Sequence, residues 1–302
     1  MTGGPVYYIR AAFKGTFGKA LAAIFAILIV LALGFTGNMV QSNSIGAAFS
    51  EVFSARNIEI PSIVFGLILA AVIGFIFLGG VNRLASVVEK IVPIMAGIYI
   101  VGSLVLILMN ITALPGAIKM IFVGAFNPEA VVGAGAGIAV REAIRFGVAR
   151  GLFSNEAGMG STPHAHARAK VENPHKQGLA AMISVFIDTF IILNLTVFSI
   201  LTTGVLDSGK EGTALTQAAF TKGFGNFGDI FVAVCLLFFA FSTILGWHFF
   251  GEVNVKYLFG EKAAKFYSIL VIGFVIVGST LKVQLVWSLS DFFNGLMVIP
   301  NA

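Results

Sequence analysis

Arg-Gly-Leu-Phe-Ser-Asn-Glu-Ala-Gly-Met-Gly-Ser-Thr-Pro, residues Arg150–Pro163, is a polar, glycine-rich stretch between long apolar segments. Its glycines and its final proline weaken a helix, because glycine leaves the backbone unrestrained and proline cannot donate the helical hydrogen bond. Irregular backbone is tolerated in hydrocarbon only where it is buried in protein or lines a watery cavity. The stretch therefore indicates either a discontinuous membrane helix that binds a polar group or an ordinary loop between two spans.

The composition is that of an integral membrane protein. Of the 302 residues, 58% are hydrophobic and 11% are charged, with a mean hydropathy of +0.96, whereas soluble domains average about 25% charged residues. The net charge of +5 is explained by the surplus of lysine and arginine in cytoplasmic loops, so we expect no nucleic-acid partner. No P-loop, nucleophile elbow or zinc-helix motif occurs in the sequence, and we expect no resident cofactor.

Apolar segments long enough to cross a bilayer, about 20 residues each, recur along the chain. We interpret residues 1–302 as one transmembrane domain. Its expected spans are 20–40, 61–80, 91–111, 136–164 (broken), 178–203, 229–257, 266–287 and 289–302, the last one truncated by the end of the sequence. Residues 41–59 are expected to be a polar connection between the first two spans.

The distribution of lysine and arginine bears on the two interpretations of the opening stretch. If the amino terminus is cytoplasmic and one crossing lies between Thr112 and Gln177, most cationic residues of the connections fall on the cytoplasmic side. Without that crossing, every later segment changes side and most of them fall outside. Because cytoplasmic loops carry the surplus of lysine and arginine, the sequence favours a discontinuous span.

The opening stretch, continued by Ala165-His-Ala167, closely resembles the signature of the sodium:alanine (or glycine) symporter family. Further similar blocks follow the family's order over nearly the whole chain: Gly3–Tyr8, Gly37–Asn43, Val185–Thr189, Phe239–Trp247 and Val286–Asp291. The family belongs to the amino acid–polyamine–cation superfamily. The resemblance implies an all-α membrane protein, a multi-span helical bundle of the five-plus-five inverted-repeat type. It also implies a multi-pass protein of the cell membrane, the inner membrane in bacteria.

The sequence departs from the family pattern in one respect. Family members carry another discontinuous helix ahead of Gly3–Tyr8, and inverted repeats should give a pair of interrupted helices. This sequence contains one, and it stops within an apolar run at Ala302. We therefore expect the bundle to be incomplete at both ends, and the chain to be a fragment that does not transport alone.

The broken stretch supplies candidate substrate ligands. Freed amides and side-chain oxygens around Ser154, Asn155 and Gly158 suit the carboxylate and ammonium of an amino acid. Phe153 could form the floor of a small side-chain pocket. Trp247 is a further candidate for substrate contact, with an anchoring role at the membrane interface as the alternative. For the other residues the alternative is that they satisfy only the backbone of the broken helix.

A pair of hydroxyl groups is the candidate cation site. Ser242 and Thr243 are adjacent on an expected helix, and Thr243 lies four residues before Trp247, so those two share a face. Oxygen ligands suit a hard cation. In similar transporters this helix gives two adjacent hydroxyls to a sodium ion, so the resemblance implies a sodium site at Ser242 and Thr243. The alternative is that both hydroxyls bond only their own helix.

Two carboxylates fall inside expected spans, where unpaired charge is costly. We expect Glu156 to be structural and paired with Arg150 or a neighbouring amide. Asp188 is either a functional group or a helix-packing hydrogen-bond partner.

The resemblance thus implies secondary active transport of a small neutral amino acid, alanine or glycine, coupled to sodium influx, with no enzymatic chemistry. The expected partners are the amino acid, the sodium ion and the lipid bilayer. One alternative is proton coupling with Asp188 as the relay. A second is an intramembrane enzyme that uses Glu156 or Asp188 with His164.

Overall fold

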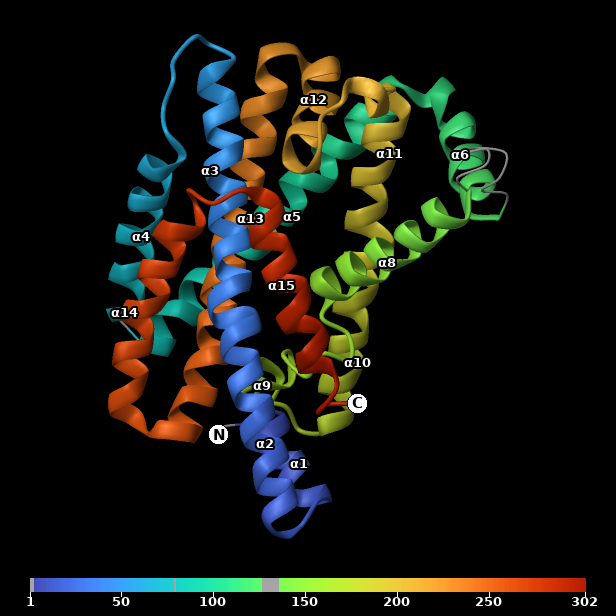
Figure 1. Cartoon of the computed structure of the whole chain (residues 1–302). Helices are drawn as coiled ribbons and strands as arrows, with labels where there is room; N and C mark the ends of the chain where they lie inside the picture. The colour runs from blue at the N-terminus through green and yellow to red at the C-terminus, as the bar shows by residue number, and fades with distance from the viewer. Residues whose placement is uncertain (1–2, 79, 127–135) are drawn as a thin grey trace.

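The computed structural model describes residues 3–78, 80–126 and 136–302, and this part of the chain is a bundle of helices without a strand (Figure 1). The helices are α1 (Pro5–Ala12), α2 (Gly15–Ile29), α3 (Asn38–Ser54), α4 (Ser62–Leu78), α5 (Gly80–Met109), α6 (Leu114–Phe126), α8 (Ala136–Asn155), α9 (Pro163–His166), α10 (Pro174–Phe186), α11 (Leu193–Thr203), α12 (Gly212–Phe224), α13 (Gly228–Phe259), α14 (Glu261–Gly278) and α15 (Val283–Val298). The all-α class expected from the sequence is confirmed for the described residues, while the inverted repeat stays a prediction.

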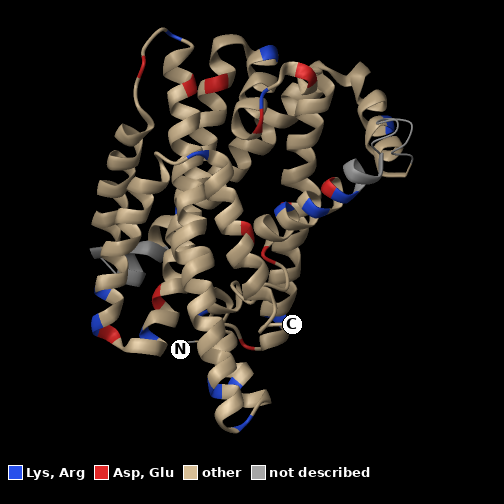
Figure 2. Cartoon of the chain, viewed as in Figure 1, with Lys and Arg blue, Asp and Glu red and all other residues tan. Residues whose placement is uncertain are grey.

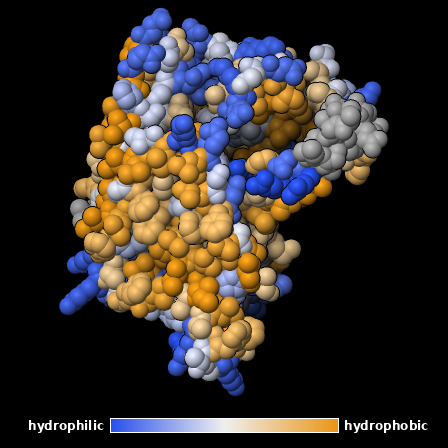
Figure 3. Space-filling view, in the orientation of Figure 1, coloured by the Kyte–Doolittle hydropathy of each residue, from blue (hydrophilic) through white to orange (hydrophobic). Residues whose placement is uncertain are grey.

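Four segments are long and apolar enough to cross a membrane among the described residues: Gly15–Ser54, Ser86–Met109, Pro174–Thr203 and Gly212–Phe259. Charged residues gather at the two ends of the bundle and along α8, and the middle of the bundle is nearly free of them (Figure 2). Apolar side chains cover most of the face between those ends (Figure 3). This distribution suits helices whose middle parts face hydrocarbon, although the exact membrane boundaries of the spans stay a prediction.

The first long helix continues well beyond its expected end. Helix α2, the π-helical segment η1 (Val30–Gly37) and α3 form one helical run from Gly15 to Ser54, so the polar connection expected over residues 41–59 is wrong. The polar residues face protein. Asn43, for example, donates two hydrogen bonds of 2.8 Å from its Nδ2, to the carbonyls of Gly278 and Leu281.

The end of the chain also differs from expectation. One span was expected over 266–287, but α14 ends at Gly278 and α15 begins at Val283. The carbonyls that Asn43 binds belong to the last residue of α14 and to the turn that follows it. The break between the helices therefore has a tertiary partner on α3, which hydropathy along the chain does not reveal.

Helix α13 runs through the main hydrophobic cluster. Its buried residues include Ile244, Leu245 and Trp247, and they share a cluster with Phe25 of α2 and Val271 of α14. The contact with η1 is very close, because a Cβ on Gly37 would lie 2.6 Å from the ring of Trp247. Glycine at position 37 thus lets the indole pack directly on the backbone of the first long helix.

Candidate functional site

The helix is interrupted within the stretch that the sequence singled out. Helix α8 ends at Asn155, and α9 begins at Pro163 (Figure 1). Between them the backbone turns left-handed three times, at Glu156 (φ 54°), Gly158 (φ 78°) and Gly160 (φ 81°). Glycine reaches this region without steric cost, but a residue with a Cβ pays roughly 1–2 kcal/mol. The hydrogen bonds of its side chain hold Glu156 in this strained backbone conformation.

The interruption leaves backbone donors without partners. The amide groups of Gly158, Gly160, Ser161 and Thr162 make no hydrogen bond to any described residue. The carbonyl of Gly158, in contrast, accepts a 2.8 Å hydrogen bond from the Asn301 side chain. Amides without partners in a membrane protein require a polar ligand or water. These four N–H groups are therefore the main hydrogen-bond donors that the interruption offers to a ligand.

The Glu156 carboxylate is held by neutral donors. One oxygen accepts a 2.6 Å hydrogen bond from the indole nitrogen of Trp247, and the other accepts a hydrogen bond from the hydroxyl of Ser161. Neither of the expected partners of Glu156, Arg150 or a neighbouring amide, bonds this carboxylate among the described contacts. Arg150 instead forms an ion pair with Asp291.

Three aromatic rings from different helices meet beside the interruption. Phe153 of α8 packs on Trp247 of α13, with ring centroids 5.1 Å apart at 85°, and on Trp287 of α15, at 4.9 Å and 58°. The guanidinium of Arg150 lies 3.7 Å from the centroid of the Trp287 ring, a cation–π contact. Two predicted substrate residues, Phe153 and Trp247, are therefore in direct contact.

The next two predicted residues face another element. The Ser154 hydroxyl donates to both carboxylate oxygens of Asp188, at 2.8 and 3.1 Å, and the Asn155 amide donates to the Thr189 hydroxyl at 3.0 Å. Asp188 and Thr189 lie in the π-helical segment η4 (Ile187–Ile192) between α10 and α11. Such segments interrupt the regular helical ladder and occur often at functional sites. Gly158, the remaining predicted substrate residue, is exposed.

The proposed cation ligands bond their own helix. The hydroxyls of Ser242 and Thr243 each donate a 2.9 Å hydrogen bond to the carbonyl of Phe239. This geometry leaves the lone pairs of both oxygens available to a cation. No hydrogen bond links the pair to the interruption within the described residues, and those residues contain no group of three or more His, Cys, Asp and Glu that could hold a metal. A cation here would have to use hydroxyl and carbonyl oxygens, which suit a hard ion.

His164 is a packing residue in this structure. Its Nδ1 lies 2.7 Å from the carbonyl of Ser161, and its Nε2 lies 2.8 Å from the Asn254 side-chain nitrogen on α13. The ring is 1% exposed, and neither Glu156 nor Asp188 forms a hydrogen bond with it among the described contacts. The arrangement gives no support to an enzyme built on these groups.

The site also contains residues that the sequence analysis did not assign to it. These residues are Asn254, Trp287 and Asn301, and each lies 90 or more positions from its partner in the site. Asn301 also falls in the last span, which was expected to be truncated. Trp287 and Asp291 do fall in a block that resembles the family pattern. The blocks therefore signalled importance, but they gave no indication of which residues contact one another.

Comparison with known proteins shows that the chain is similar to several carrier and symporter proteins. The amino-acid carrier protein AlsT of Bacillus subtilis is 42% identical over 300 residues, which cover 99% of this chain and 62% of AlsT. The probable sodium/glutamine symporter GlnT of the same organism is 41% identical, with 99% of this chain and 60% of GlnT covered. The sodium/alanine symporter AgcS of Methanococcus maripaludis is 37% identical, with 100% and 65% covered. The chain thus spans about three fifths of the length of these curated relatives.

The family comparison covers the whole chain. The model of the sodium:alanine symporter family matches residues 1–302, and it includes the interrupted helix, the Ser242-Thr243 pair and the aromatic cluster described above. This match, together with the relatives, shows that the chain belongs to the sodium:alanine symporter family.

Proposed function

We propose that this protein takes part in secondary transport of a small neutral amino acid, alanine or glycine, coupled to sodium influx across the cell membrane. The observation that carries the proposal is the interrupted helix, with four amides that make no hydrogen bond to any described residue, beside the contact of Phe153 with Trp247. The names of two of these relatives include sodium, with alanine for AgcS and glutamine for GlnT. Those names support a sodium-coupled carrier of neutral amino acids.

The proposed binding mode follows from the polarity of the interruption. The amides of Gly158, Gly160, Ser161 and Thr162 would donate to the substrate carboxylate. The last carbonyls of α8 lie where a helix carries partial negative charge, and they would accept from the ammonium group. Phe153, packed against Trp247, would bound the space left for the side chain.

The proposed sodium site uses oxygen ligands on α13. Ser242 and Thr243 would supply two hydroxyl oxygens while they donate to the Phe239 carbonyl. Because Thr243 is one helical turn before Trp247, an ion bound there would affect the same stretch of α13 that borders the substrate. This proximity is the physical basis we propose for coupling.

Equilibrium binding tests the proposal, because binding requires fewer conformational changes than transport does. The protein in nanodiscs should bind radiolabelled alanine in sodium chloride, and the binding should be lost when choline replaces sodium. Unlabelled glycine should compete and glutamate should not, since Arg150, the cation beside the aromatic rings, is already paired with Asp291. The Gly147→Ala variant, changed on α8 where a Cβ meets nothing within 4 Å, is the matched control.

The alternatives give other results in the same measurements. Binding that follows pH and ignores sodium would replace sodium coupling with proton coupling through Asp188. Chemical conversion of a bound amino acid would indicate an enzyme. Absence of alanine binding in both salts would contradict the proposal.

A further inference from the structure

Two π-helical segments, η1 and η4, contact the surroundings of the interrupted helix. In η1, Gly37 lies against the ring of Trp247, which in turn binds the interruption. In η4, Asp188 and Thr189 accept hydrogen bonds from the last two residues of α8. A π-helical turn is wider than an α-helical one, with hydrogen bonds that span five residues instead of four. The two wide turns therefore lie in the helices that border the proposed amino-acid site.

The wide turn of η4 leaves one carbonyl without a backbone donor. The amide of Leu193 donates to the carbonyl of Asp188, five residues back. From Leu193 onward α11 is a regular α-helix, in which each amide donates to the carbonyl four residues back, so the pattern passes over the carbonyl of Thr189. The side-chain nitrogen of Asn194 donates to that carbonyl at 3.1 Å, and also to the carbonyl of Phe190 at 3.2 Å.

The same pairing occurs in η1. There the amide of Asn38 donates to the carbonyl of Leu33, five residues back, and the pattern passes over Gly34. The side-chain nitrogen of Asn38 donates to the Gly34 carbonyl at 3.0 Å. The side-chain oxygen of Asn38 has no partner among the described residues, although the residue is 0% exposed. This buried side chain is therefore used as a hydrogen-bond donor.

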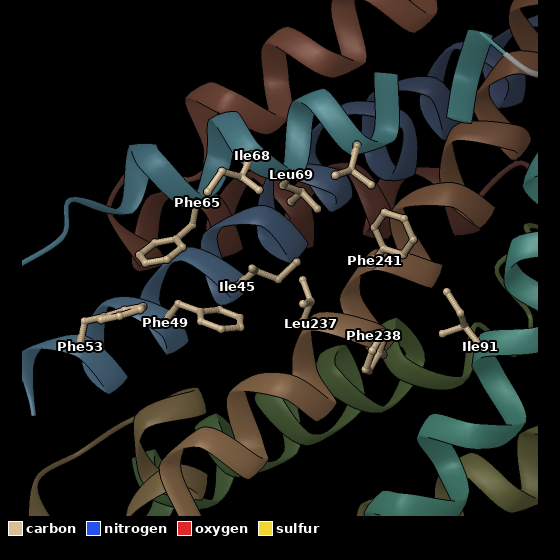
Figure 4. A pocket seen from close by; sticks show the side chains of 11 residues that line it. Ile45, Phe49, Phe53, Phe65, Ile68, Leu69, Ile91, Leu237, Phe238 and Phe241 are labelled. Atoms are coloured by element: carbon tan, nitrogen blue, oxygen red, sulfur yellow. The ribbon is translucent and has the colours of Figure 1, made fainter. Parts of the chain in front are cut away.

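Regular α-helix resumes beyond η1. Figure 4 shows Ile45, Phe49 and Phe53 of α3 along one wall of an apolar cavity, and side chains four residues apart share a face of an α-helix. The wide turn is thus confined to η1. Because both π-helical segments show the same pairing, capping of the freed carbonyl by an asparagine is a recurring feature of this chain.

The wide turn of η4 lies between two tertiary contacts. Before it ends, the hydroxyl of Thr189 accepts a 3.0 Å hydrogen bond from Asn155 of α8. Beyond it, Thr196 of α11 shares a 2.6 Å hydrogen bond with Tyr99 of α5. In a continuous α-helix, which has no room for the extra residue of the wide turn, one of these contacts would be rotated by about 100° relative to the other. The wide turn therefore allows this helix to contact α8 and α5 at the same time.

We propose that Asn194 is a positioning residue of the amino-acid site, because it stabilises the wide turn that places Asp188 and Thr189 against the end of α8. Thr189 is the direct link, since its carbonyl binds Asn194 and its hydroxyl binds Asn155. This role rests on the proposed function, in which Ser154 and Asn155 belong to the site.

Alanine binding to the protein in nanodiscs tests the proposal with two variants of nearly the same shape. Asn194→Val removes the donor and should weaken alanine binding by about tenfold, the effect of losing one hydrogen-bonded contact. Asn194→Thr should retain most of the affinity, because the hydroxyl of Thr36 in η1 reaches the carbonyls five and four residues back, at 3.0 and 2.9 Å. Thr202→Val, which removes an ordinary bond to the Phe198 carbonyl within α11, is the matched control and should leave the affinity unchanged.

A second measurement reports the placement of Asp188 without any ligand. A double-mutant cycle of Ser154→Ala and Asp188→Ala, measured by unfolding, gives the coupling energy of this pair. The coupling should be present in the parent protein, in Thr202→Val and in Asn194→Thr, and it should be lost in Asn194→Val. Asn194→Ala, which also lacks a donor, takes the place of Asn194→Val if that variant does not fold.

Two results would overturn the role of Asn194. One is a Ser154–Asp188 coupling that persists without the donor at position 194. The other is alanine binding that is equally strong in Asn194→Val and Asn194→Thr. A parent protein that binds no alanine would contradict the proposed function alone, and the cycle would still decide whether Asn194 positions Asp188.

Discussion

Glu156 combines a left-handed backbone with a carboxylate that accepts hydrogen bonds from two neutral donors, Trp247 and Ser161. Hydrogen bonds to an ionised group are stronger than neutral ones, so the pair of donors offsets part of the cost of a charge within the bundle. The contact with Trp247 also connects the interruption to α13. Loss of the indole donor should therefore affect stability before any substrate is added.

We expect Trp247→Phe to lower the free energy of unfolding by about 1–3 kcal/mol, the cost of leaving a buried acceptor short of a donor. Denaturation of the substrate-free protein in nanodiscs measures this. The same substitution in a Glu156→Gln background should cost less, because a neutral acceptor loses less. Equal losses in both backgrounds would show that the indole contributes by packing alone.

Thr243 is the residue that tests the sodium site. Replacing it with alanine removes one proposed oxygen ligand, so sodium affinity should fall by about tenfold, which corresponds to about 1.4 kcal/mol. Thr243→Ser keeps the hydroxyl and should retain most of the affinity. Sodium dependence of alanine binding measures both variants. If Thr243→Ala leaves it unchanged, the hydroxyl serves only its bond to the Phe239 carbonyl.

Most contacts between residues at the interruption could not be predicted from the sequence. Glu156 was expected to pair with Arg150 or a neighbouring amide, but the partner of Arg150 is Asp291, which lies 141 positions away. Glu156 in turn is held by Trp247, 91 positions away. Local spacing predicts a contact only when both residues lie on one helix. Phe153 and Trp247 are in contact, and their roles, like those of Ser154, Asn155, Gly158, Ser242 and Thr243, stay predictions.

Helix α8 illustrates what residue types can foretell about an element. The glycines and the proline of Arg150–Pro163 predicted an interruption, and the chain leaves the helix there, with left-handed angles at Glu156, Gly158 and Gly160. Helix α3 illustrates the opposite case. Its polar residues predicted a connection, yet Asn43 is helical and donates to the carbonyls of Gly278 and Leu281 on another part of the chain. Hydropathy does not distinguish a polar residue in water from one that faces protein.

The two glycines of the interruption should differ in sensitivity. At Gly158 a Cβ would meet nothing within 4 Å, so Gly158→Ala should cost only the left-handed strain, about 1–2 kcal/mol. At Gly160 a Cβ would also lie 2.6 Å from the Asn301 side chain and 2.8 Å from Pro5, so Gly160→Ala should cost more. Unfolding free energies of the two variants measure the difference.

The control for this series is Gly147→Ala, in the regular part of α8. There the substitution should stabilise the helix by about 0.8–1 kcal/mol, because alanine is the better helix former. If Gly158→Ala were stabilising as well, position 158 would be helical in the protein, and the interruption would be shorter than described.

The ion pair of Arg150 and Asp291 connects α8 to α15. Both side chains are about one third exposed, 34% and 29%, so we expect a coupling energy of about 1–3 kcal/mol, between the values for exposed and buried pairs. A double-mutant cycle of Arg150→Ala and Asp291→Ala measures it. The exposed pair of Lys176 and Glu172, with side chains 64% and 85% exposed, should give no more than about 0.5 kcal/mol. Equal values for the two pairs would mean that Arg150 contributes mainly by its contact with Trp287.

At the scale of the whole molecule, α13 joins the parts of the proposed mechanism. It carries the Ser242-Thr243 pair, the indole that binds Glu156, and Asn254, which binds His164 of α9. A displacement of α13 would therefore change the geometry of both proposed sites. A change at the interruption would in turn displace the helix that carries the two hydroxyls. If the two sites are coupled through this helix, sodium and the amino acid must change each other's binding affinity.

We expect sodium and alanine to raise each other's affinity by the same factor, because the coupling free energy between two sites is reciprocal. Typical couplings of about 1–3 kcal/mol correspond to factors of roughly 5–150. Alanine titrations at several sodium concentrations give one factor, and sodium titrations at several alanine concentrations give the other. In Thr243→Ala, apparent alanine affinity should be weak at low sodium and should recover as sodium approaches saturation, because the substrate ligands themselves are intact. An alanine affinity that no sodium concentration restores would place Thr243 among the substrate ligands, and a factor of one in the parent protein would exclude coupling through α13.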